Sequence, residues 1–362
     1  MIHLKYPQHL LILLTFFILN SKPDLYAQGL ASKIDSVLQH KFNANTPGAS
    51  FLIARNGKIL YKKALGLSNL ELNLPMHTEN VFQIASMTKQ FTAIAILMLE
   101  EKGKLKVTDE ITKFLPNYPT QGHKITIHHL LTHTSGIRDF TRVKGLNTIA
   151  QKNQTPSQMI DFFKNESMDF APGEKFKYNN SGYLILGAII ENITEQTYAD
   201  FIEEHIFKKL GMNSSHYASH QKIIKNRASG YHKRVHYVNN GKINFSVPYA
   251  SGSLMSTVAD LFTWQEALKN NLLIGKETTK KAFTNYTLSN GEKVQYGYGW
   301  HLKANNGVSS REHGGHIFGF KSMGVYLPDS DIYVVGLTNC DCNSPTQITR
   351  EIAALTHKYS TK

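Results

Sequence analysis

Residues 86–102 read SMTKQFTAIAILMLEEK, contain no proline and end at Gly103. The length of this stretch and its strong helix formers predict one long helix. Ala93 to Leu99 are apolar without a break, which indicates that the helix is covered on every side and lies in the core. Ser86 stands where the N-cap or the first turn of that helix belongs.

Strand patterns lie on both sides of this helix in the sequence. Residues 49–55 (ASFLIAR) and 58–64 (KILYKKA) are joined by Asn56-Gly57, the strongest short signal of a β-hairpin. Further strands are predicted at residues 297–303, 320–327 and 332–338. The last two are joined by a turn at residues 328–331, which read Pro-Asp-Ser-Asp.

Helical patterns fill most of the remaining chain. They are predicted at residues 32–42, 126–131, 157–165, 181–192, 198–210, 257–270 and 345–357. Strands at both ends with helices between them predict an α+β fold, in which an antiparallel sheet is flanked by N- and C-terminal helices and carries an inserted, mostly helical domain. We expect residues 29–110 and 250–362 to form the α/β domain and residues 111–249 to form the insertion.

The N-terminus has the pattern of an export signal. Lys5 lies in a short polar lead, residues 10–19 (LLILLTFFIL) are apolar, and Ala27 offers a cleavage site that would leave Gln28 first. The apolar run is shorter than the roughly 20 residues that span a bilayer. We therefore expect residues 1–27 to be a signal peptide, the protein to be periplasmic or secreted, and no stable membrane span. An uncleaved anchor or a buried strand is the alternative interpretation of this run.

The composition favours a packed globular protein with a basic surface. Of 362 residues, 41% are apolar and 19% charged, which supports a core and argues against global disorder. The net charge of +13 would draw the protein to anionic polymers, membranes or nucleic acid. The Lys and Arg residues are scattered along the chain and no nucleic-acid motif occurs, so no nucleic-acid partner is expected.

Cys340 and Cys342 are the two cysteines of the chain. One residue separates them, which predicts that a mutual disulfide is geometrically awkward. Their neighbourhood supplies no further metal ligands, so neither a metal nor another cofactor is expected.

Ser86 and Lys89 form a Ser-x-x-Lys motif at the start of the long helix. Residues i and i+3 share a helix face, so the lysine amine reaches the serine hydroxyl. A serine needs a nearby base to act as a nucleophile, and burial can make a lysine such a base. The motif arises by chance about once in a chain of this length. A second copy, Ser219 to Lys222, lies in a polar stretch without an apolar helix behind it.

Two later motifs carry chemistry that would complement this pair. The Tyr178 phenol can act as an alternative base or a proton shuttle, and the Asn180 amide can hold substrate carbonyls and the lysine. A similar Tyr-x-Asn stands at residues 237–239, before a turn. Residues 313–316 (HGGH) precede a strand, and their glycines allow a strand edge to approach a ligand closely.

In this order, Ser86-x-x-Lys89, Tyr178-x-Asn180 and His313-x-Gly315 resemble the motifs of class C β-lactamases, low-molecular-weight DD-peptidases and related esterases. Three further stretches look similar: residues 129–136 (HLLTHTSG), 178–182 (YNNSG) and 250–260 (ASGSLMSTVAD). The resemblance covers residues 30–355, and the combination is far more specific than any one motif.

The resemblance implies a role for each motif residue. Ser86 would be acylated and Lys89 would take its proton. Tyr178 would share the base role and protonate the leaving group, while Asn180 would orient Lys89 and the substrate.

It also implies an oxyanion hole formed by the backbone N–H groups of Ser86 and His316. The glycine at position 315 would let that strand edge come close to the substrate, and His313 would stand where the β-lactamases have a lysine.

The third motif departs from the Lys-Thr-Gly or Lys-Ser-Gly usual in enzymes that act on β-lactams. Gly314 has no hydroxyl and His313 is mostly neutral near pH 7, so carboxylate recognition is expected to be weak. This favours a DD-peptidase-like or esterase-like enzyme acting on small esters or D-amino-acid amides, with a cell-wall peptide as one candidate substrate.

Two alternatives stay open at this point. The first is a class C-type β-lactamase, and the second is a non-catalytic sensor that binds penicillin or wall peptides in the same pocket. His128, His129 and His133 lack the spacing of a helical zinc pair and are interpreted as structural. No Gly-x-Ser-x-Gly motif occurs, which counts against an α/β-hydrolase.

Overall fold

The structure is a computed structural model and describes residues 28–305 and 307–361. The predicted signal peptide, residues 1–27, lies outside the described residues. Within the described part of the chain, no helix combines the length and the apolar character needed to cross a membrane.

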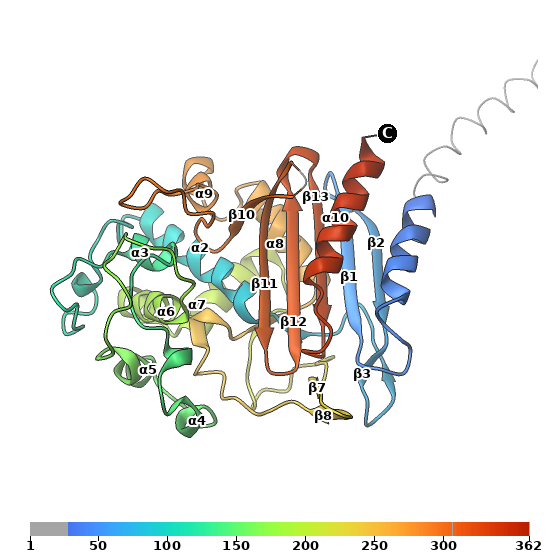
Figure 1. The fold of residues 1–362 in the computed structure, drawn as a ribbon, viewed down its shortest axis with the longest axis horizontal. Coiled ribbons are helices and arrows are strands. Elements are labelled where there is room, and N and C mark those ends of the chain that lie inside the picture. The colour runs from blue at the N-terminus through green and yellow to red at the C-terminus, as the bar shows by residue number, and fades with distance from the viewer. Residues whose placement is uncertain (1–27, 306, 362) are drawn as a thin grey trace, which may run out of the picture.

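A six-stranded antiparallel sheet forms one side of the molecule, on the right in Figure 1, in the order β10-β11-β12-β13-β1-β2. Its strands are β1 (Ala49–Arg55), β2 (Lys58–Leu65), β10 (His301–Asn305), β11 (Val308–Ile317), β12 (Phe320–Leu327) and β13 (Ile332–Thr338). The two ends of the chain meet where β1 pairs with β13, with Ala49 opposite Thr338. Together with the helices, this sheet confirms the predicted α+β fold.

The two faces of the sheet are covered by different helices. In β1, Phe51 and Ile53 pack into a cluster with the N-terminal helix, described over residues 28–39, and with α10 (Thr346–Ser360). Leu52 and Ala54 face the other way, into the main core with α2 (Thr88–Glu101) and α8 (Val258–Lys269). This is the alternation that a pleated strand imposes.

The helix α2 is enclosed as its sequence predicts. Every residue from Thr88 to Leu99 is buried, and the ring of Phe91 stacks on Trp264 of α8 at a centroid distance of 4.1 Å. Ser86 lies in the 3-10 turn η1 (Ala85–Met87) that leads directly into α2. The helix therefore carries the Ser-x-x-Lys motif into the interior of the protein.

The remaining elements surround α2 and the end of the sheet. The helices are α3 (Ile127–Leu131), α4 (Leu146–Ile149), α5 (Pro156–Phe163), α6 (Asn180–Thr194), α7 (Tyr198–Ile202), the π-helix η4 (Glu203–Lys208) and α9 (Lys276–Ala282). The short strands are β3 (Leu67–Asn69), β4 (Leu74–Pro75), β5 (Phe82–Gln83), β6 (His216–Tyr217), β7 (Tyr231–Lys233), β8 (Tyr237–Asn239) and β9 (Leu254–Ser256). Thr126 and Thr155 cap α3 and α5 with reciprocal capping boxes.

The strand predicted at residues 297–303 begins later, as β10 at His301, and β11 was not predicted. Residues 297–300 form a turn instead of a strand, and a side chain at Gly297 would meet the carbonyl oxygen of Ala282 at 2.1 Å. In β11, Glu312 faces inward and is paired with Arg350 and Lys303. The buried positions of this strand carry a serine, a carboxylate and a histidine, so it does not show the apolar alternation by which strands are predicted.

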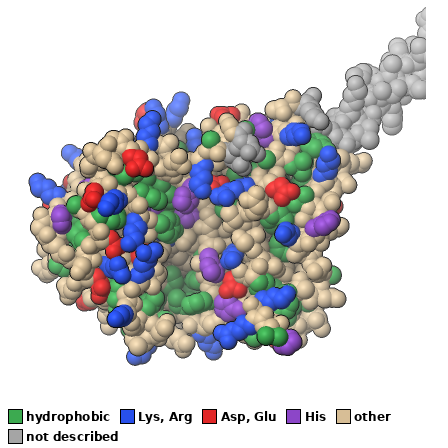
Figure 2. Space-filling model, viewed as in Figure 1, with side chains coloured by type: hydrophobic (Ala, Val, Ile, Leu, Met, Phe, Trp, Pro, Cys, Tyr) green, Lys and Arg blue, Asp and Glu red, His purple; other side chains and the backbone are tan. Residues whose placement is uncertain are grey.

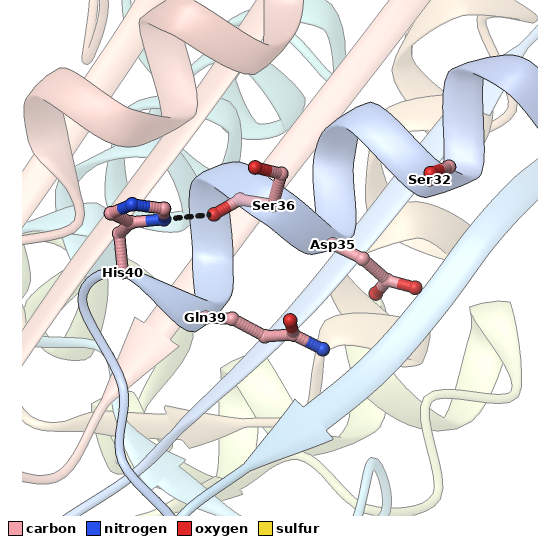
Figure 3. A pocket seen from close by; sticks show the side chains of 5 residues that line it. All are labelled: Ser32, Asp35, Ser36, Gln39 and His40. Carbon is pink, nitrogen blue, oxygen red and sulfur yellow. Dashed lines mark hydrogen bonds between the residues drawn. The ribbon is translucent and has the colours of Figure 1, made fainter.

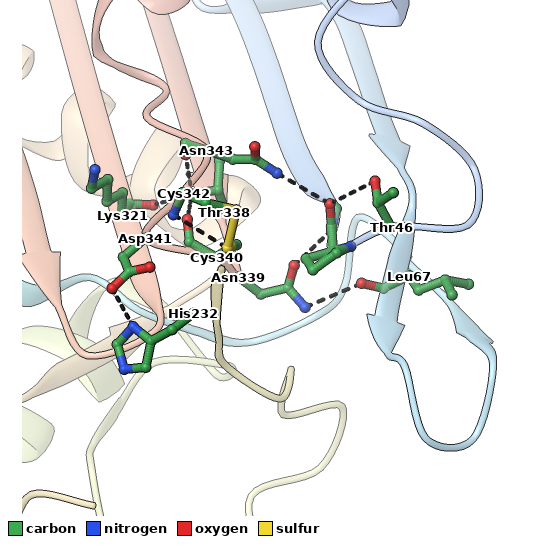
Figure 4. Close-up of a disulfide and its surroundings, with 12 residues drawn as sticks. Thr46, Leu67, His232, Lys321, Thr338, Asn339, Cys340, Asp341, Cys342 and Asn343 are labelled. Carbon is green, nitrogen blue, oxygen red and sulfur yellow. Dashed lines mark hydrogen bonds and ion pairs between the residues drawn. A yellow bond between two sulfur atoms is a disulfide. The ribbon is translucent and has the colours of Figure 1, made fainter. Parts of the chain in front are cut away.

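The expectation that Cys340 and Cys342 do not pair was wrong (Figure 4). The two form a disulfide, because the turn after β13 brings their Cα atoms to 5.1 Å, within the range that a disulfide spans. Next to them, the Asn339 side chain accepts a hydrogen bond from the Gly48 N–H at 2.7 Å and donates to the Ser229 carbonyl at 2.9 Å. This loop ties the end of the sheet to the segment that leads into β7.

Candidate active site

The turn that carries Ser86 is shaped by its neighbours. Ala85 has φ of +49°, a left-handed conformation that costs energy for a residue other than glycine. From the sheet, Ser322 of β12 donates a hydrogen bond to the Ile84 carbonyl at 2.7 Å. Gly315 of β11 lies so close that an added Cβ would be 2.3 Å from the same carbonyl oxygen. The predicted motif around residue 315 is therefore brought against the predicted nucleophile.

Lys89 is fully buried, and its ammonium group has three hydrogen-bond acceptors. Nζ lies 3.2 Å from the Oγ of Ser86, 2.9 Å from the Oδ1 of Asn180 and 2.9 Å from the carbonyl oxygen of Ser251. Burial lowers the pKa of Lys89 from 10.5 to about 7, and the Asp139 carboxylate opposes part of that shift. A large fraction of the amine is therefore neutral near pH 7 and can accept a proton from Ser86.

Asn180, the first residue of α6, is held by a buried carboxylate. The Oδ2 atom of Asp139 accepts hydrogen bonds from the backbone N–H of Asn180 at 2.8 Å and from its Nδ2 at 3.0 Å. These contacts fix the amide so that its oxygen points at Lys89. Asp139 was not predicted, because a single acid in a polar stretch shows no pattern that links it to a lysine fifty residues away.

Tyr178 completes the group around Ser86. Its hydroxyl oxygen is buried and makes no standard hydrogen bond to the described residues, while its ring lies 4.8 Å from the Nζ of Lys89. Burial raises the pKa of Tyr178 well above 10, and an interaction with the Ser86 hydroxyl opposes part of this rise. The phenol is therefore protonated at neutral pH, which makes Lys89 the stronger candidate for the base and Tyr178 the candidate for a proton donor.

His133 holds the segment that carries Tyr178. Its carbonyl oxygen accepts a hydrogen bond from Lys177 N–H at 3.0 Å, and its Nδ1 accepts one from Asn179 N–H at 3.1 Å. Its ring lies 4.4 Å from the Tyr178 ring. Burial keeps the pKa of His133 well below 6.5. His133 therefore has a structural role, because it holds the residues on both sides of Tyr178, Lys177 and Asn179, in place.

His313 is buried and neutral. Its Nδ1–H donates a hydrogen bond to the carbonyl oxygen of Gly314 at 2.6 Å. Nε2 therefore carries no proton and accepts a hydrogen bond from the Tyr296 hydroxyl at 3.1 Å. Burial, followed by the nearby His301 and Lys89, holds the pKa of His313 well below 6.5. His313, which stands at the position where β-lactamases have a lysine, therefore provides no positive charge.

The expected oxyanion donors lie on the two segments that meet at Gly315. The pairing of β10 with β11 ends where His301 faces Glu312, so β10 does not cover the edge of β11 beyond that point. The His316 side chain is exposed, and its Nε2 lies 4.0 Å from the carboxylate of Asp341. Its role in the expected oxyanion hole therefore rests on its backbone N–H alone.

The second Ser-x-x-Lys copy has none of these features. The Oγ of Ser219 accepts hydrogen bonds from the backbone N–H groups of Gln221 and Lys222, at 3.0 and 3.1 Å. The Lys222 ammonium is exposed and lies 3.7 Å from Glu203. Within the part of the chain that the structure describes, no buried base is hydrogen-bonded to this serine.

A polar depression of about 590 Å³ on the N-terminal helix is also separate from the site (Figure 3). It is lined by Ser32, Asp35, Ser36, Gln39 and His40. Asp35 accepts hydrogen bonds from Tyr61 and Lys63 of β2. Since this helix covers the opposite face of the sheet from α2, the depression adds nothing to the chemistry at Ser86.

Comparisons with known proteins show which family and fold this chain shares. The sequence profile of the family described as Beta-lactamase matches residues 31–357. Penicillin-binding protein 4* of Bacillus subtilis (strain 168) is 33% identical over 318 residues, which cover 83% of this chain and 69% of that protein. The solved structure of the octameric penicillin-binding protein homologue from Pyrococcus abyssi is 31% identical, with a TM-score of 0.78 over 91% of this chain and 77% of that one.

A D-stereospecific amidohydrolase from Streptomyces sp. has a TM-score of 0.75 and 24% identity, over 88% of this chain and 98% of that one. At this level of identity the match shows a shared fold.

Proposed function

Because the chain belongs to the Beta-lactamase family, we propose that it is an exported serine hydrolase that works through an acyl-enzyme on Ser86. The observation that supports this best is the buried Lys89 amine, with a pKa of about 7, at 3.2 Å from the Ser86 hydroxyl. Export is proposed from the apolar run at residues 10–19.

The proposed reaction uses the groups in a fixed order. Neutral Lys89 accepts the hydroxyl proton while the Ser86 oxygen attacks the substrate carbonyl carbon, and the negative charge moves to the carbonyl oxygen. Backbone N–H groups of Ser86 and His316 stabilise that oxyanion. Tyr178 protonates the leaving amine or alkoxide and is reprotonated from Lys89. Water then releases the acyl group from Ser86 by the reverse sequence of proton transfers.

The substrates we propose are small esters and D-amino-acid amides without a free carboxylate beside the scissile bond. The neutral His313 and the missing hydroxyl at Gly314 provide neither the charge nor the donor that would hold such a carboxylate. The Bacillus subtilis relative is named a penicillin-binding protein, and the Pyrococcus abyssi structure is described as a penicillin-binding protein homologue. Because penicillin contains a cyclic amide, these names support a pocket that accepts amide bonds.

The proposal is tested with a substrate panel on the purified protein, comprising a p-nitrophenyl ester, a D-amino-acid amide and a chromogenic cephalosporin. We expect turnover of the first two to exceed that of the third. Ser86→Ala should abolish turnover and labelling by a serine-reactive phosphonate, whereas Ser219→Ala should change neither. Faster cephalosporin turnover would identify a β-lactamase, and an unlabelled protein that still binds wall peptides would identify a sensor.

A further inference from the structure

Exposed apolar side chains gather at the tips of three hairpins. Ten large apolar side chains are exposed among the described residues, and five of them lie on the hairpins β3–β4, β7–β8 and β11–β12. These five are Leu72, Leu74, Val235, Val238 and Phe318. Val235, at the tip of β7–β8, is 86% exposed. We call these three tips the hairpin surface.

Hydrogen bonds hold the three tips together. The Leu70 N–H, on β3–β4, donates to the Tyr231 hydroxyl of β7 at 2.8 Å. The Asn240 side chain, just after β8, donates to the carbonyl oxygen of Phe318 at 2.9 Å. Gly319, which follows Phe318, has φ of +78° and packs closely against Asn240. A Cβ added at Gly319 would lie 2.6 Å from the Cβ of Asn240. The apolar side chains therefore belong to one continuous part of the molecule.

The charge around these tips is positive. Lys233, Arg234 and Lys242 are exposed on and beside β7–β8. Residues 205–259, which include this hairpin, contain eight Lys and Arg residues and no Asp or Glu. The two acids on neighbouring segments are engaged locally, Glu71 by Tyr231 and Asp341 by His232. Figure 2 shows basic, histidine and apolar side chains side by side along the lower edge, where Figure 1 places β7 and β8.

We propose that the hairpin surface binds peripherally to an anionic lipid bilayer. Apolar side chains such as Val235 and Phe318 would enter the boundary between headgroups and acyl chains, while the basic side chains contact lipid phosphates. Projecting tips with a basic rim suit this interface better than a flat or hollow protein partner. Phe318 follows His316 by two residues on the hairpin that borders Ser86, so binding would place the active site near the membrane surface.

The test measures sedimentation of the purified protein with vesicles that contain about 30% phosphatidylglycerol in phosphatidylcholine, compared with pure phosphatidylcholine. We expect binding to the anionic vesicles only, weakened in about 0.5 M salt. The double variant Lys233→Glu/Arg234→Glu should bind at least about tenfold more weakly. A matched control, Lys276→Glu/Lys280→Glu on α9, has the same change in charge far from the hairpins and should retain binding.

A second variant, Val235→Ser, keeps the charge and should also weaken binding. All variants share residues 1–27, so any binding through that segment is equal in them. Equal binding by the two charge variants, or equal binding to both kinds of vesicle, would overturn the proposal. The proposal would also be wrong if the protein did not bind vesicles but formed dimers that Val235→Ser abolishes. In that case the hairpin surface would join two copies of the chain. Ester hydrolysis in solution should stay unchanged in every variant, which separates this proposal from the proposed function.

Discussion

The ammonium nitrogen of Lys89 lies 3.2 Å from the hydroxyl oxygen of Ser86, at a position buried from solvent. Removing a cation from water disfavours its charged form, which is why the pKa of Lys89 is lowered to about 7. We expect kcat/KM for an ester substrate to rise with pH and level off above about pH 7, since the neutral amine is the active form. A profile that is flat between pH 5.5 and 8.5, a range of about three units around this pKa, would contradict the role of Lys89 as base.

The same lowered pKa links stability to pH. Between about pH 7 and 10.5 the unfolded chain holds a proton on Lys89 that the folded protein has lost, so the free energy of unfolding should rise with pH across this window. For a shift of this size the limit is about 5 kcal/mol. Urea denaturation of Lys89→Met should lack this rise. If the difference in stability between wild type and variant stays constant across the window, the lysine titrates normally.

Asp139 should act on the reaction through Asn180 and Lys89. Asp139→Asn removes the charge that raises the pKa of Lys89, so the acid limb of the pH profile should move to lower pH. The new amide can also turn the Asn180 side chain, and we expect kcat to fall by about 10- to 100-fold. Asp161→Asn, on the exposed face of α5, is the control and should change neither kcat nor the acid limb of the pH profile. A lower kcat with an unmoved acid limb would leave Asp139 with a purely structural role.

Much of the fold could be predicted because its signals are local. β12 and β13 have the predicted bounds, since each apolar run is bordered by turn residues, and the apolar stretch of α2 is buried as predicted. Asp139 and His133 act through contacts between segments distant in the sequence, which no local pattern shows. β11 was missed because its buried positions carry Ser310, Glu312 and His313 in place of apolar residues. The disulfide was missed because its geometry depends on the turn that follows β13.

Tyr178→Phe should lower the turnover of amides far more than the turnover of activated esters. The Tyr178 phenol is protonated at neutral pH, and an amine cannot leave without receiving a proton. We therefore expect amide turnover to fall by about 10²- to 10⁴-fold, whereas acylation by a p-nitrophenyl ester, whose phenolate leaves unprotonated, should fall far less. Tyr237→Phe, in the unrelated Tyr-x-Asn copy, should have no effect. Equal losses on both substrates would assign Tyr178 to the base role shared with Lys89.

Gly315→Ala should push the edge of β11 away from the turn that carries Ser86. A Cβ at this position would lie 2.3 Å from the Ile84 carbonyl oxygen and 2.9 Å from the Cβ of Ala85, so β11 or the turn before Ser86 must move. We expect a stability loss of about 1 to 3 kcal/mol by thermal denaturation. We also expect kcat/KM to fall by at least about 10²-fold, because displaced N–H groups no longer meet the oxyanion. Gly241→Ala, whose added Cβ meets nothing within 4 Å, is the matched control. Should Gly315→Ala retain full activity, the edge of β11 would have no part in stabilising the transition state, and the oxyanion donors would have to come from another segment around Ser86.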